Sequence, residues 1–130
     1  LDEQNDVDQD NPLVARLKAS LAEDVETVRA TQRLVDSPSC LVLAEDQLGP
    51  QMRRMLEAAG QPVPENKPVL EVNLDHDLLR VLDSVEEGDK FNDLAALLLD
   101  QAMLAEGQLP KNPAATARRM HQMLVSAVNN

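Results

Sequence analysis

The chain has 130 residues, a mass of 14.3 kDa and 23 acidic against 12 basic residues, so its formal net charge is −11. Such an acidic chain repels phosphates, and with one Phe, no Trp and no Tyr it lacks stacking platforms for bases, which argues against nucleic-acid binding. The length is typical of one domain, and the apolar runs are too short to span a membrane. The single Cys rules out a disulfide framework and favours a cytoplasmic location.

The first ten residues differ in composition from the rest of the chain. Five of them are acidic, and apolar residues are scarce. This composition predicts an acidic, disordered linker over residues 1–10, followed by one folded domain over residues 11–130. Because the chain begins Leu-Asp-Glu without an initiator Met, we expect it to be a fragment of a longer protein or a processed chain.

The first helix is predicted from an Asn-Pro pair at residues 11–12. Asn caps a helix with its side-chain oxygen, and Pro suits the first helical position because its missing N–H has no partner there. Leu13, Leu17 and Leu21 then recur at every fourth position, which gives the helix one narrow apolar stripe before it ends near residue 23.

Three strands are predicted from the apolar patterning. Residues 25–34 alternate between apolar and polar, residues 39–43 are apolar after Ser39, and residues 69–73 form a third short run. A turn signal at residues 36–38 separates the first two runs, so we expect these two strands to pair as a hairpin.

A helix over residues 50–59 is predicted to end at Gly60, and three prolines make residues 61–68 an extended loop. One side of this helix carries an apolar stripe, made of Leu48, Met52, Met55, Leu56 and Ala59. The stripe either packs on the sheet, as amphipathic helices usually do, or forms an exposed adhesive surface. Flexible, polarisable Met side chains favour the second alternative, and the flanking Gly-Pro and Pro-rich segments would let the helix stand away from the core.

Helices are also predicted over residues 75–85, over residues 89–106 and from the Asn-Pro pair at 112–113 onward. The helix over 89–106 is apolar nearly all round, so it should be buried on most sides. Either the first helix covers this surplus, or two copies of the chain pair as a four-helix bundle. The second alternative predicts these interface residues: Leu94, Leu97, Leu98, Gln101, Leu104, Ala117, Met120 and Leu124.

Candidate catalytic residues are few. Cys40, the only thiol, lies in an apolar strand, which is typical of a structural residue. His76 stands at a predicted helix start, where we expect a capping role, and no second metal ligand follows three or four residues later. With four glycines and no phosphate-binding spacing, the sequence predicts no catalytic, metal or cofactor residue.

Five collinear segments resemble the C-terminal dimerisation domain of the bacterial heat-shock protein 90 family. They are RATQRLVDSPSC (29–40), QM (51–52) with AAGQPVP (58–64), LEVNLDH (70–76), LLDQA (98–102) with AEG (105–107), and RRM (118–120) with Gln122. The resemblance covers residues 13–126; each segment alone is a weak signal, but five in this order are specific.

The resemblance implies an α+β fold with a small three-stranded sheet, flanking helices and a C-terminal helix pair that forms a four-helix bundle in a homodimer. It implies a chaperone part that contacts unfolded or partly folded client proteins, with the contacts made by Leu48, Met52, Met55 and Leu56. The ATP- and Mg-binding domain and the middle domain of the family are missing, so we expect no cofactor and no ATPase activity in this chain. The alternative from another functional class is a monomeric acidic adaptor domain.

Overall fold

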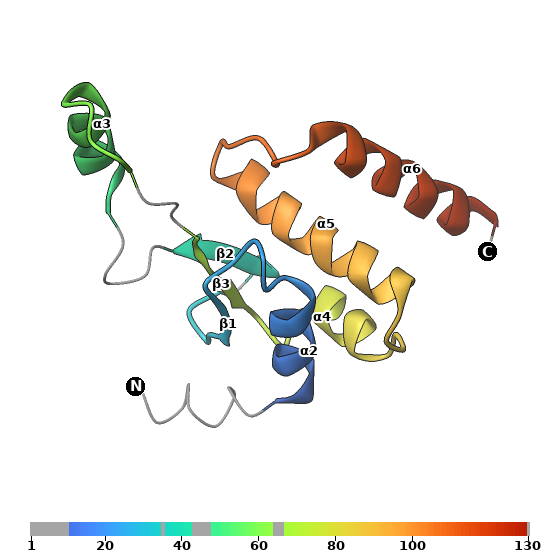
Figure 1. Cartoon of the computed structure of the whole chain (residues 1–130). Coiled ribbons are helices and arrows are strands. Elements are labelled where there is room, and N and C mark those ends of the chain that lie inside the picture. The colour runs from blue at the N-terminus through green and yellow to red at the C-terminus, as the bar shows by residue number, and fades with distance from the viewer. Residues whose placement is uncertain (1–10, 35, 43–47, 64–66, 130) are drawn as a thin grey trace.

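The computed structural model describes residues 11–34, 36–42, 48–63 and 67–129 of the chain. The predicted acidic linker, residues 1–10, lies outside the described residues, as do residues 64–66 of the Pro-rich loop. The described elements are α2 (Pro12–Ser20), β1 (Thr27–Ala30), β2 (Ser39–Val42), α3 (Pro50–Ala58), β3 (Val69–Val72), α4 (Asp77–Asp83), α5 (Asp89–Ala105) and α6 (Pro113–Asn129) (Figure 1). The predicted α+β class and the three-stranded sheet are confirmed.

The sheet has the strand order β1-β3-β2, so the predicted hairpin between the first two strands is wrong. β3 lies between them, parallel to β1 and antiparallel to β2, with Leu70 opposite both Val28 and Leu41. All four residues of β3 are buried, whereas β1 alternates between buried and half-buried residues. The most buried strand takes the central position because there both of its edges are hydrogen-bonded and both of its faces are covered.

The hydrophobic core lies between one face of the sheet and the helices α2, α4 and α5. The predicted α2 stripe of Leu13, Leu17 and Leu21 is fully buried there. The largest share of the core comes from α5, through Phe91, Leu94, Ala95, Leu98, Leu99 and Ala102. The prediction that α5 is buried on most sides is confirmed for this stretch, and α2 packs directly against it.

Local capping signals position the helices. Asn11, His76 and Asn112 each accept a backbone N–H of the following helix with a side-chain atom, at 2.7, 3.0 and 3.1 Å. Gly60 and Gly107 have φ angles of +72° and +80°, left-handed values that favour Gly, and they follow α3 and α5. The capping role expected of His76 is therefore confirmed.

Arg16 of α2 fixes the corner between α4 and α5. Its guanidinium donates to the backbone oxygens of Asp83, the last residue of α4, at 3.5 Å, and of Val85, two residues further on. The same group lies 4.1 Å from the centre of the Phe91 ring in the first turn of α5, a distance at which a cation is attracted to an aromatic face. One side chain thus ties three helices together.

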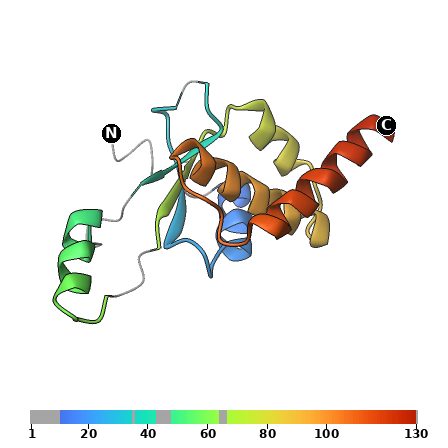
Figure 2. The ribbon, with the colours of Figure 1, turned by 90° about the horizontal axis from the view of Figure 1, so that it is seen from above.

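Two helices extend away from this core. α3 stands apart from the core at one end of the molecule (Figure 1). α6 folds back along α5, and its C-terminal half then projects beyond the rest of the chain, as the view from above shows (Figure 2). The candidate functional surfaces lie on these two helices.

Candidate functional site

α3 is exposed on its apolar side. No residue of α3 is buried, and the Met52 and Met55 side chains are 47% and 60% exposed, while Leu48 and Leu56 are half-buried. Of the two alternatives, packing on the sheet is therefore wrong for Met52 and Met55, which face solvent. We refer to Leu48, Met52, Met55 and Leu56 as the α3 apolar surface.

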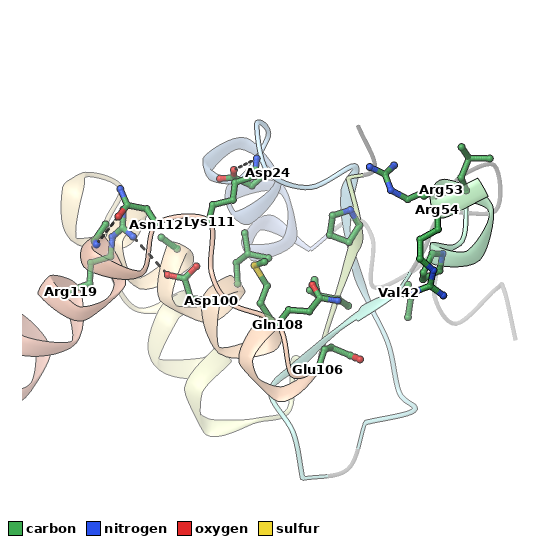
Figure 3. Close-up of a pocket in the computed structure, with 18 of the residues that line it drawn as sticks. Asp24, Val42, Arg53, Arg54, Asp100, Glu106, Gln108, Lys111, Asn112 and Arg119 are labelled. Atoms are coloured by element: carbon green, nitrogen blue, oxygen red, sulfur yellow. Dashed lines mark hydrogen bonds and ion pairs between the residues drawn. The ribbon is translucent and has the colours of Figure 1, made fainter. Parts of the chain in front are cut away.

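The charged side of α3 faces the body of the molecule instead. Arg53, Arg54 and Glu57 line a cavity of about 770 Å³ between α3 and the α5–α6 corner (Figure 3). Leu41, Leu99 and Met103 contribute apolar lining from β2 and α5. Leu48, just before α3, also lines this cavity, whereas Met52 and Met55 do not. Within α3 the two sides are therefore chemically distinct, and the side with the methionines points away from the cavity.

A buried polar contact anchors the start of α6 on α5. The Thr116 hydroxyl donates to the Asp100 carboxylate at 2.6 Å, and both residues are buried. Arg119 lies 3.8 Å from the same carboxylate and 3.5 Å from that of Asp93, also on α5. These contacts fix the first two turns of α6 with charge-assisted pairs, which are stronger than neutral hydrogen bonds.

The rest of α6 has no covering layer within the described chain. Every residue from Met120 to Asn129 is exposed. Five of these residues are large and apolar, and we refer to them as the α6 apolar face: Met120, Met123, Leu124, Val125 and Val128. A contiguous apolar patch of this kind is uncommon on monomers and marks an interaction surface.

The residues predicted for a dimer interface fall into two groups. Leu94 and Leu98 are buried in the chain's own core, so a partner has no access to these side chains. Leu97 is half-buried, and the exposed members are Gln101, Leu104, Ala117, Met120 and Leu124. The prediction omitted Met123, Val125 and Val128, although the spacing of Met120, Leu124 and Val128 at every fourth position indicates a shared helix face.

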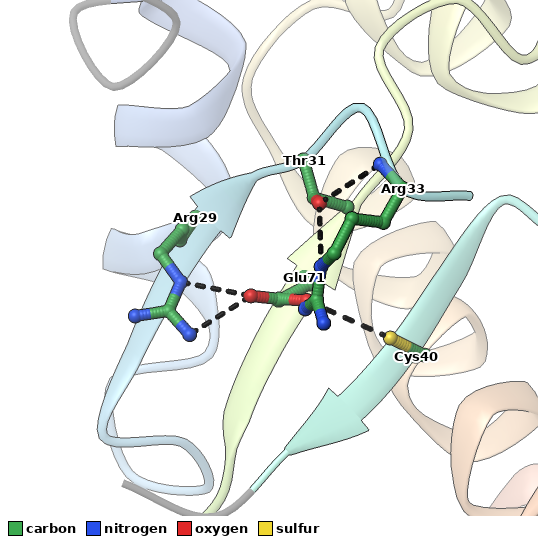
Figure 4. A network of polar contacts seen from close by, with 5 residues as sticks. All are labelled: Arg29, Thr31, Arg33, Cys40 and Glu71. Carbon is green, nitrogen blue, oxygen red and sulfur yellow. Dashed lines mark hydrogen bonds and ion pairs between the residues drawn. The ribbon is translucent and has the colours of Figure 1, made fainter. Parts of the chain in front are cut away.

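Cys40 lies beside a charged cluster on the outer face of the sheet (Figure 4). Its thiol donates to Glu71 at 3.9 Å, and Glu71 is buried beneath Arg29, at 2.8 Å, and Arg33. The apolar surroundings expected for Cys40 are therefore only part of its environment. Burial raises the pKa of the Cys40 thiol, although Arg33 and Arg29 oppose this effect, so the protonated, unreactive form predominates at neutral pH.

Within the described ranges, no group of three His, Cys, Asp or Glu side chains is placed to hold a metal ion. The same part of the chain contains no helix with the length and apolarity required to cross a membrane.

Comparison with known proteins gives consistent matches. A family model described as Hsp90 protein matches residues 2–130. A chaperone protein HtpG from Alcanivorax borkumensis is 76% identical over 127 residues, which cover 98% of this chain and 21% of that protein. Chaperone proteins HtpG from Bordetella parapertussis and Polaromonas naphthalenivorans are 53% and 50% identical, over 89% and 90% of this chain and 18% and 19% of their own lengths. The chain spans about a fifth of the length of these curated relatives.

Proposed function

The chain belongs to the Hsp90 protein family, and we propose that it serves as the homodimerisation and client-contact part of a chaperone about five times its length. The observation that carries this proposal is the α6 apolar face, which is left uncovered although the start of the same helix is firmly anchored. A second copy of the chain can cover it symmetrically, because each copy offers the same face.

In the proposed dimer, the α5–α6 pairs of two copies form a four-helix bundle. Leu97, Gln101 and Leu104 recur along α5 outside the core, so both helices contribute. Fully burying a large aliphatic side chain contributes roughly 1.5–3 kcal/mol. The five side chains of the α6 apolar face from each copy are therefore enough to offset the loss of translational and rotational freedom, which costs on the order of 4–15 kcal/mol.

Light scattering at micromolar concentration tests the dimer. We expect a mass of twice 14.3 kDa, because the interface of a permanent homodimer buries about 2,000 Å² or more and does not dissociate on dilution to this range. A mass of 14.3 kDa at all concentrations would contradict the proposal and favour the monomeric acidic adaptor, whose binding to a basic partner would weaken with added salt.

The α3 apolar surface is proposed to contact client proteins. An unfolded chain exposes apolar side chains in no fixed arrangement, and Met side chains adapt to many shapes because they are unbranched and polarisable. Because the charged side of α3 faces the cavity, the methionines stay directed outward, where a client segment can reach them.

Replacing both Met52 and Met55 with Lys is expected to weaken binding to an unfolded protein by about tenfold or more while the fold is kept. The reason is that both side chains are exposed, and substitutions at exposed sites usually change stability by less than about 0.5 kcal/mol. Fluorescence anisotropy with a reduced, carboxymethylated protein as the client measures the affinity, and thermal unfolding followed by circular dichroism measures the stability.

The matched control is Val81→Lys on α4, since the Val81 side chain is 55% exposed and lies outside the α3 apolar surface. This variant should bind the client like the original chain. Equal losses in both variants would show a general effect of charge, and a large drop in the unfolding temperature of the double variant would show that the methionines are core residues.

In the longer chaperone, this part of the protein would act by tethering. ATP and Mg²⁺ are expected to bind to a domain outside these 130 residues. Holding two such domains in one dimer raises the effective concentration of each for the other, to the millimolar range for short linkers, without any new contact between them.

A further inference from the structure

The residues of α6 have an unusual charge composition for this chain. The chain has 23 Asp and Glu residues, but α6 has none. The ionisable side chains of α6 are Arg118, Arg119 and His121. Arg119 contacts α5, where it pairs with Asp93 and Asp100, whereas His121 is exposed.

Helix geometry places His121 within the α6 apolar face. Successive residues are turned by about 100°, so His121 points nearly the same way as Val128, seven positions later, and lies between Leu124 and Val125 around the axis. Arg119 is about 160° away from His121 and faces α5. His121 and Val125 also line a shallow hollow of about 410 Å³ along α6.

We infer that His121 makes the self-association of this chain sensitive to pH, with the dimer formed by the neutral imidazole and opposed by the protonated one. The inference rests on the proposed dimer, because only a second copy covering the α6 apolar face removes His121 from water. Burial in apolar surroundings disfavours a charged group unless a group of opposite charge accompanies it.

Within the described residues, His121 has no carboxylate partner that could stabilise its imidazolium on burial. On the same helix, Arg118 lies three residues before His121 and adds positive charge. On α5, which packs against α6, Asp93 and Asp100 are both paired with Arg119. A second copy would add another α6 without acidic residues. On its α5, the half-buried Leu97 and the exposed Gln101 and Leu104 are uncharged, and the exposed Asp89 and Lys90 in the first turn carry opposite charges.

The expected direction follows from this arrangement. Because the neutral imidazole is the form that can be buried, the dimer is most stable where His121 is neutral and loses stability as acid protonates it. Because each copy must shed a proton, the dimer Kd should rise roughly tenfold to a hundredfold between pH 7.5 and 5.5. The net charge of −11 acts in the opposite direction, since acidification reduces the repulsion between two acidic copies.

Sedimentation equilibrium of the 130-residue chain at pH 5.5, 6.5 and 7.5, at constant ionic strength, measures this Kd. We expect the rise in the original chain, and a flat profile for His121→Gln, which keeps a polar side chain but cannot gain a proton. The control is His76→Asn, which retains a capping side chain for α4 and should keep the full pH response.

Three results would overturn the inference. They are a Kd that does not change with pH, a response that survives in His121→Gln, and a loss of helical circular dichroism at pH 5.5 that accompanies dissociation. A chain that is monomeric at every pH would instead contradict the proposed dimer itself.

Discussion

Replacing Leu124 with Asp is expected to convert the proposed dimer into a folded monomer of 14.3 kDa. The Leu124 side chain is 62% exposed and contributes nothing to the chain's own core. In the proposed dimer the new carboxylate would be buried twice, once from each copy, without a partner of opposite charge. A penalty of several kcal/mol for each buried charge raises the dimer Kd by about a hundredfold or more.

Light scattering measures the mass of this variant, and circular dichroism tests whether its helices remain. Gln122→Asp is the matched control, because it adds the same charge to an exposed site on the same helix, about 160° away from Leu124. This control should remain dimeric. A dimeric Leu124→Asp variant would show that the α6 apolar face is not the interface.

Replacing Leu98 with Asp is expected to unfold the chain. Leu98 is 2% exposed and packs in the core of the same chain. Truncating a buried Leu to Ala already costs about 2–5 kcal/mol, and a buried, unpaired carboxylate adds to that cost. Because a domain of this kind has a total stability of about 5–15 kcal/mol, little or no folded chain should remain.

Thermal and urea unfolding followed by circular dichroism distinguish this result from dissociation. Leu104→Asp serves as the control, since it places the same charge on an exposed site of α5 and should keep the helical signal. If Leu98→Asp instead gave a folded monomer, Leu98 would belong to the interface, and the core assignment would be wrong.

The helices were predictable from sequence to within a few residues, because their signals are local. Asn-Pro pairs mark the starts of α2 and α6, and a Gly in left-handed conformation follows α3 and α5. The strand order was not predictable, because strands of four residues carry little information about their partners. Because β1 and β2 are adjacent in the chain, a hairpin between them was expected. Instead β3, whose four residues are all buried, lies between them.

The candidate surfaces were only partly predictable for a related reason. An amphipathic pattern shows that Met52 and Met55 share a helix face, but it is the same whether that face meets a core or solvent. Likewise, the apolar α5 gave no sign of which side was internal, so Leu98 was assigned to a partner. The Glu71 cluster was missed because Arg29 and Arg33 lie about 40 residues earlier and meet Glu71 only through the sheet.

In the part of the chain that the structure describes, α6 is attached to α5 only near its N-terminal end, so a small tilt there moves its C-terminal end by a larger distance. The Thr116–Asp100 contact holds its base, and Val128 lies twelve residues further on, about 18 Å along the helix axis. A tilt of about 10° at the base would therefore shift the far end by about 3 Å. In the proposed dimer, small rearrangements in α5 would in this way be amplified into changes of the angle at which the two copies meet.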